Sequence, residues 1–277
     1  MGAVMSRFVA FLEREGSLRA LALMRIGTGL LLWSRFAREM MPLRYLEPDR
    51  IALSVVFYVL STCMVFGVFT RVTMPLSALM MGVIVMGYGE TSVEDWSHHH
   101  TTLHMLAVWW LTLAPTGRAL SVDRWWAIAD AEASGEAIPS ERGPVWPSLL
   151  LAMQVATLYL WSLGDKLSNG FYTGVQLEQI SMRYYFGSAP PDALSWLYPV
   201  LAWAVLVLEV ALPVALFVRR WQAWAMALGV VMHVMFYILI PVNTFTMQML
   251  LLYLAFLDPD DVHAAIDRLL GHRAKPS

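Results

Sequence analysis

The chain has 277 residues, of which 58% are hydrophobic and 14% are charged, and it contains 12 Trp and 18 Met. Soluble domains are about 45 to 50% apolar and about 25% charged, so this composition indicates an integral membrane protein with the lipid bilayer as a partner. The formal net charge of -2 provides no basic stripe to neutralise phosphates, which excludes nucleic acid as a partner. Cys63 is the only cysteine, so neither an internal disulfide nor a cysteine-based zinc site is expected.

Eight apolar segments follow one another along the chain, and a membrane-spanning helix needs about 20 mostly apolar residues. The segments cover residues 17–35, 51–69, 72–89, 99–115, 146–166, 194–218, 221–240 and 242–257. Pro241-Val242-Asn243 separates the last two and predicts a tight turn. The predicted fold class is therefore all-α, a polytopic membrane helix bundle of about eight transmembrane helices in a single domain over residues 1–277.

The first apolar segment follows Arg7, Arg14 and Arg19 and has no small-residue cleavage site, so we expect an uncleaved signal-anchor helix. With an even number of spans, the loops on the side of the two termini hold more Lys and Arg than the loops on the opposite side. Positively charged loops stay inside, which predicts cytoplasmic termini. The loop 90–100 and the end of the fifth span then lie toward the outer face.

Two short segments between the spans are expected to form interfacial helices. One begins at Ser121, a residue type that caps helices, and carries Trp125 and Trp126, which prefer the membrane interface. The other covers residues 175–186 and has the basic and aromatic composition of a helix at the headgroup level.

A lysine stands at the end of the fifth span, where an amine is expensive unless it is paired or used. A desolvated lysine can act as a neutral-amine base, so Lys166 is a candidate catalytic residue. Tyr159, seven residues earlier, lies on the same helix face, whereas Gln154 and Asp165 define another stripe. Two alternatives stay open: Lys166 snorkels to the interface, or the Asp165 carboxylate favours its ammonium form.

Histidines gather at the entry to the fourth span, in the run from Trp96 to His104. His100 and His104 are four residues apart and share a helix face, which suits metal ligation. No HExxH motif is present, a third ligand would have to come from elsewhere, and no metal is expected. A wet loop of interface-seeking histidines also explains His98 and His100.

Three further polar residues fall inside predicted spans. Arg25 and Glu209 are expected to be structural buried charges that neutralise each other, because unpaired charges at depth are costly. His233 is either a core histidine with a satisfied hydrogen bond or a site residue.

The order and spacing of these motifs resemble the membrane domain of the vitamin K-dependent gamma-carboxylases and their bacterial relatives, the HTTM (horizontally transferred transmembrane) family. The resemblance covers nearly the whole chain. The matching motifs are Trp96-Ser97-His98-His99, Ser121-Val122-Asp123, Gln154 to Tyr159 to Lys166 and Gly174, Glu209 to Pro213, His233 and Phe256-Leu257-Asp258-Pro259.

The resemblance implies that Lys166 deprotonates a reduced quinone of the vitamin K hydroquinone or menaquinol type. Dioxygen then adds to the quinol anion, and the resulting alkoxide takes a proton from a glutamate side chain, which captures carbon dioxide. His99 matches a histidine that is important for the second stage of this reaction, the carboxylation. The residues expected to bind the quinone are Trp96, His98, Gln154, Tyr159 and His233.

Three differences from the carboxylases limit which of their properties are expected of this chain. Position 165 is Asp where they have a second lysine, position 98 is His where they have an amide, and the large extramembrane part that recruits tagged substrates is not expected. The preferred hypothesis is a quinol-dependent enzyme, with or without carboxylation, in a bacterial inner (plasma) membrane, acting on a secreted peptide or small acceptor. The alternatives are a non-enzymatic membrane factor for peptide export, immunity or scaffolding, and a heme or metal redox subunit.

Overall fold

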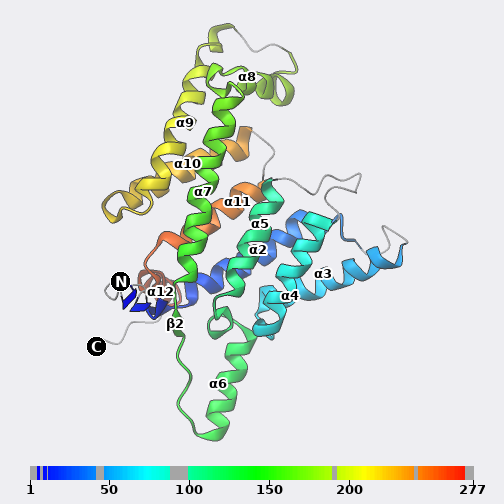
Figure 1. Cartoon of the computed structure of the whole chain (residues 1–277), viewed down its shortest axis with the longest axis vertical. Coiled ribbons are helices and arrows are strands. Elements are labelled where there is room, and N and C mark those ends of the chain that lie inside the picture. The colour runs from blue at the N-terminus through cyan, green and yellow to red at the C-terminus, as the bar shows by residue number, and fades with distance from the viewer. Residues whose placement is uncertain are drawn as a thin grey trace. The chain divides into compact units, whose positions relative to one another are not determined.

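The computed structural model describes residues 5–6, 9–10, 12–41, 47–87, 99–188, 192–239 and 243–271. These residues are almost entirely helical, which confirms the predicted all-α class (Figure 1). In chain order the elements are β1 (Glu15–Ser17), α2 (Arg19–Phe36), α3 (Pro48–Phe66), α4 (Thr70–Gly82), the π-helix η1 (Val83–Gly87), α5 (His99–Thr112), η2 (Thr116–Arg118), α6 (Val122–Ser134), β2 (Arg142–Pro144), α7 (Pro147–Ser168), η3 (Phe171–Thr173), α8 (Val175–Ser181), the π-helix η4 (Met182–Phe186), η5 (Asp192–Leu194), α9 (Leu197–Ala215), α10 (Arg219–Leu239), α11 (Asn243–Leu252), η6 (Tyr253–Phe256) and α12 (Pro259–Leu269).

Each of the eight predicted spans coincides with a helix, and five described helical segments are long and apolar enough to cross a membrane. Those five are residues 48–66, 70–87, 147–168, 192–215 and 219–239. The other three differ for physical reasons: α2 carries Arg19, Arg25 and Arg35, α5 has 14 residues, and α11 has only 10. The predicted turn at Pro241 lies outside the described residues except for Asn243, where α11 begins.

The chain divides into two compact units, of which unit 1 comprises residues 1–151 and 254–277 and unit 2 comprises residues 152–253. In unit 1, α2 packs against α3 and α5, and α4 packs against both α3 and α5. In unit 2, α10 packs against α9 and α11, and α8 packs against α9. Figure 1 shows α9 and α10 side by side, joined by a short turn.

The predicted interfacial helices are both helical. Ser121 is the N-cap of α6, and its hydroxyl accepts a hydrogen bond of 2.9 Å from the backbone N–H of Arg124. Trp125 and Trp126 are both exposed, as interfacial residues would be. The second segment forms α8 followed by η4.

Arg25 is fully buried, as predicted, but its partners are backbone carbonyls. Its guanidinium donates to Met64 and Val65 in the last turn of α3, and also to Leu120 at 2.7 Å. Carbonyls at a helix C-terminus lack intrahelical partners and favour a cation. The predicted pairing of Arg25 with Glu209 is therefore wrong, since Arg25 caps α3 and Glu209 binds a different cation.

Asp123, at the start of α6, joins that helix to α4. Its carboxylate accepts hydrogen bonds from the backbone N–H of Phe69 at 2.6 Å and from the backbone N–H and hydroxyl of Thr70, both at 2.7 Å. These donors belong to the first turn of α4, whose N–H groups have no intrahelical acceptor. The cap matters because Phe69 has a left-handed φ of 48°, a conformation that a non-glycine residue adopts only at some cost.

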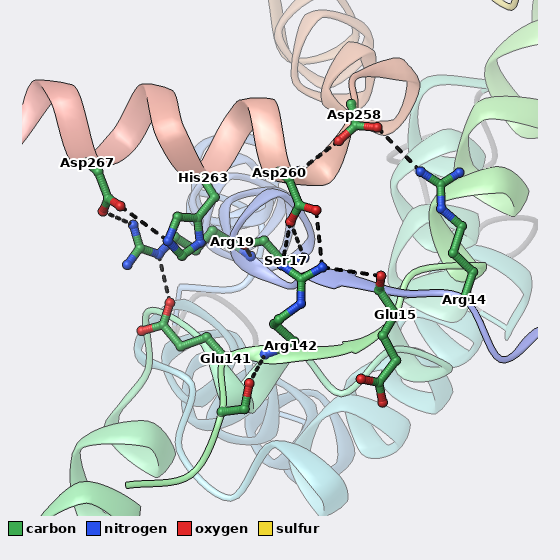
Figure 2. A network of polar contacts seen from close by, with 11 residues as sticks. Arg14, Glu15, Ser17, Arg19, Glu141, Arg142, Asp258, Asp260, His263 and Asp267 are labelled. Atoms are coloured by element: carbon green, nitrogen blue, oxygen red, sulfur yellow. Dashed lines mark hydrogen bonds and ion pairs between the residues drawn. The ribbon is translucent and has the colours of Figure 1, made fainter. Parts of the chain in front are cut away.

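A network of ion pairs joins β1, β2 and α12 in unit 1 (Figure 2). We call this network the clasp, and its residues are Arg14, Arg19, Glu141, Arg142, Asp258, Asp260 and Asp267. β1 and β2 form an antiparallel pair, and Arg142 on β2 binds the Asp260 carboxylate at 2.8 and 3.1 Å. Arg19 bridges Asp267 at 2.5 Å and Glu141 at 2.7 Å. The clasp therefore joins three segments that are distant in sequence.

Candidate functional site

One face of α7 carries three polar side chains inside unit 2. Tyr159, Ser162 and Lys166 are three and four residues apart, the spacing that places side chains above one another on a helix. The helix that carries them is rich in Leu and Ala, which favour helix formation. The sequence thus aligns two hydroxyl groups and an amine along a single stripe.

The Lys166 amine is held by a buried carboxylate. Its Nζ lies 2.7 Å from Oε1 of Glu209 on α9, and it also donates to the Ser162 hydroxyl. Ser162 in turn donates to the same Glu209 oxygen at 2.9 Å. The Lys166 side chain is 19% exposed and the Glu209 side chain only 3%, so the ion pair is shielded from solvent on the glutamate side.

The surroundings of Lys166 differ from both alternatives that the sequence left open. A snorkelling lysine reaches toward the headgroups, whereas this amine binds a buried carboxylate and lies 5.7 Å from the centre of the Phe171 ring. Asp165 is exposed, and its carboxylate accepts a hydrogen bond of 3.0 Å from the Asn169 side chain. The carboxylate that pairs with Lys166 is therefore Glu209.

Tyr159 belongs to a second buried cluster in the same unit. Its hydroxyl lies 2.8 Å from Nε2 of His233 on α10 and 2.5 Å from the hydroxyl of Tyr253. All three side chains are almost fully buried. A Cβ added at Gly229, one turn before His233, would stand 1.9 Å from the Tyr253 hydroxyl, so this glycine provides the space that Tyr253 fills.

The two clusters are linked through α7, which carries Tyr159 of one cluster and Ser162 and Lys166 of the other. Each cluster also holds a buried atom, Oε2 of Glu209 and Nδ1 of His233, that has no hydrogen-bond partner in the described part of the chain. Buried polar atoms are nearly always paired, and exceptions often indicate a bound water, an ion or a functional role. These two atoms are therefore candidates for contact with a ligand.

The predicted histidine cluster is only partly described. Trp96 and His98 lie outside the described residues, and His99 begins α5 without a described side chain. His104 is fully buried and its Nδ1–H donates to the His100 carbonyl at 2.7 Å. No three His, Cys, Asp or Glu residues of the described ranges are arranged to hold a metal ion.

The structure brings together Tyr159, Lys166, Glu209 and His233 in unit 2, and Gln154 is buried on the same helix α7. Sequence reasoning missed Ser162 and Tyr253. Ser162 had a signal, because it lies one turn before Lys166. Tyr253 had no such signal, because its position depends on how its side chain packs against Gly229 of α10.

A family model described as the HTTM domain matches residues 35–260. No match is found among curated proteins or among solved structures. The matched range contains all the residues of the two clusters, as well as the five apolar helices. Together these findings make the chain an integral membrane protein.

Proposed function

The chain belongs to the HTTM domain family, and from that premise we propose that it is a membrane-embedded, quinol-dependent oxygenase related to the vitamin K-dependent carboxylases. The observation that supports the proposal best is the buried Lys166–Glu209 pair, flanked by Ser162 and by the Tyr159–His233–Tyr253 cluster. Charged pairs inside membrane segments are rare and generally functional.

The substrate of the first step is a reduced quinone of the hydroquinone or menaquinol type. Removing a proton from a hydroquinone O–H leaves an oxygen anion, which a cation must stabilise at a site that excludes water. Lys166 offers that cation, and the Lys166–Glu209 pair offers a place for the proton. Dioxygen then oxidises the quinol anion to the epoxide, with one oxygen atom entering the epoxide and the other leaving as hydroxide.

The second cluster suits the other end of the quinol. His233 Nδ1 is buried and lacks a partner in the described residues, so a quinol hydroxyl or carbonyl is a suitable partner for it. Tyr159 fixes the imidazole through Nε2, in the way that hydrogen bonds orient functional histidines. Gln154, buried on α7, is a further proposed binding residue of unit 2, and the sequence resemblance adds Trp96 and His98 as proposed quinone-binding residues.

Carboxylation is the second half of the proposal. The oxygenated quinol would take a proton from an acceptor, a secreted peptide or a small molecule, which then captures carbon dioxide, with His99 serving this half. The proposed location is a bacterial inner membrane with both termini in the cytoplasm and the site toward the outer face.

The test uses the purified protein in detergent or nanodiscs, supplied with a reduced naphthoquinone and oxygen, with epoxide measured by chromatography. The unmodified protein should form the epoxide, and Lys166→Ala should lower the rate by ~100-fold or more, the usual contribution of a positioned acid or base. Ser168→Ala, an exposed change two residues further along α7, is the matched control and should leave the rate unchanged.

The competing functions give different results in the same preparation. Absence of epoxide from the unmodified protein with several quinols would favour a non-enzymatic membrane factor. A Soret band or stoichiometric metal in the purified protein would favour a redox subunit.

A further inference from the structure

We propose that Glu209 is the final acceptor of the quinol proton, which reaches it through Lys166. The inference rests on the proposed function and assigns a second catalytic group to the same site. It starts from the contact of 2.7 Å between Lys166 Nζ and Glu209 Oε1.

The charge state of Lys166 is the first step. Lys166 and Glu209 form an ion pair, and the ammonium group of an ion pair has no lone pair with which to take a proton. Lys166 therefore cannot be a base by itself in the arrangement observed. Lys166 can accept the quinol proton only when it passes one of its own protons to Glu209.

The exposure of the two groups gives the order of transfer. With 19% of its side chain exposed against 3% for Glu209, Lys166 is the more accessible of the two groups, so the proposal places the incoming quinol on the side of Lys166. Ser162 donates to Glu209 Oε1 and accepts from Lys166, which holds both groups in place.

The two oxygens of the Glu209 carboxylate differ in their partners. Both donors, Lys166 and Ser162, bind Oε1, whereas Oε2 is buried and has no hydrogen-bond partner in the described residues. Burying a polar atom without a partner is costly, and Oε2 is the oxygen of Glu209 that bears this cost.

The transfer balances without any further reagent. The hydroquinone O–H bond breaks and its proton bonds to Lys166 Nζ, as one N–H bond of the same ammonium breaks and that proton bonds to Glu209 Oε1. The products are a hydroquinone anion, a Glu209 carboxylic acid and an unchanged Lys166 ammonium. The total charge is constant, and the negative charge moves from Glu209 to the quinol oxygen on the other side of the cation.

The experiment mixes the protein with reduced naphthoquinone without oxygen and follows the absorbance of the hydroquinone anion. Glu209→Gln keeps the size of the side chain but cannot hold the proton, so anion formation should slow by ~100-fold or more. Glu209→Asp retains the acid and should recover part of the rate. Glu178→Gln, the same chemical change on α8 in unit 2, is the matched control and should behave as the unmodified protein.

Two results would overturn the inference while leaving the proposed function standing. Anion formation in Glu209→Gln at the unmodified rate would make Lys166 the sole base. Equal losses in Glu209→Asp and Glu209→Gln, with quinone binding intact, would reduce Glu209 to a positioning residue. If the unmodified protein forms no hydroquinone anion, the proposed function fails and the inference fails with it.

A second measurement does not depend on whether the Glu209 variants fold. Anaerobic quinol added to the unmodified protein should produce the infrared C=O band of a protonated carboxylic acid, and the same band should appear with Glu178→Gln. Hydroquinone anion without that band would contradict proton storage on Glu209.

Discussion

Gly229 is the residue on which the Tyr159–His233–Tyr253 cluster depends for its space. A methyl group at this position would stand 1.9 Å from the Tyr253 hydroxyl, so one of the two groups must move. Overpacking of this kind typically costs about 1 to 3 kcal/mol. Gly229→Ala should therefore lower the thermal midpoint of the protein in detergent.

Gly164 on α7 provides the control for that prediction, because a Cβ there meets no atom within 4 Å. Alanine is the better helix former by ~1 kcal/mol, so Gly164→Ala should leave the midpoint unchanged or raise it. Equal midpoints for the two variants would show that Tyr253 does not occupy the space beside α10.

Single residues were predicted better than their partners were. Lys166, Glu209, Arg25 and His233 stand out in the sequence because polar groups in apolar spans are costly. The pairing of Arg25 with Glu209 was wrong because it depends on which helix ends come together, and hydropathy does not contain that information. Arg25 donates instead to carbonyls at the end of α3.

At the scale of elements, α4 is held at its start by a residue from another helix. Asp123 accepts three hydrogen bonds from Phe69 and Thr70, and loss of a helix cap costs about 0.5 to 2 kcal/mol. Asp123→Ala should lower the free energy of unfolding by that amount, as measured by thermal or denaturant unfolding. Asp130→Ala, on the exposed side of α6, should change it by less than ~0.5 kcal/mol, and a similar loss in both variants would contradict the capping role.

Local signals explain which elements were predictable. The cap of α6 was predicted because Ser121 lies next to the helix it caps, and α10 and α11 were separated because proline marks the break. The cap of α4 was not predicted, because the carboxylate that accepts its hydrogen bonds belongs to Asp123, which lies 53 or 54 positions further along the chain. The last predicted span, 242–257, is helical from Asn243 to Phe256, but as the 10-residue α11 followed by η6 rather than as one long α-helix.

At the scale of the whole molecule, the clasp of unit 1 should respond to acid. The hydrogen bond from Arg142 lowers the pKa of Asp260 below its ordinary value of 3.8. A lowered pKa stabilises the folded state at pH values above the ordinary value, and this contribution is lost as the pH falls through the folded-state pKa. The stabilising effect of Arg142 should thus be constant above about pH 5 and disappear in stronger acid.

The measurement compares the thermal midpoints of the unmodified protein and Arg142→Gln across this pH range. The difference should narrow as the pH falls below about 4, because protonated Asp260 no longer pairs with the guanidinium. Arg71→Gln, at another exposed arginine of unit 1, should show no such narrowing. If the difference in thermal midpoint between the unmodified protein and Arg142→Gln does not change with pH, the effect of the substitution does not come from the ion pair with Asp260.

The clasp has a consequence for the order in which the protein is made. Arg14 and Arg19 leave the ribosome early, whereas their acidic partners Asp258 and Asp267 are synthesised only after the whole of unit 2. During translation, Arg14 and Arg19 therefore lack their ion pairs with Asp258 and Asp267 until the last part of the chain has been synthesised. A nascent chain stalled before residue 258 should have a protease-sensitive β1 segment, and release of the complete polypeptide should protect it.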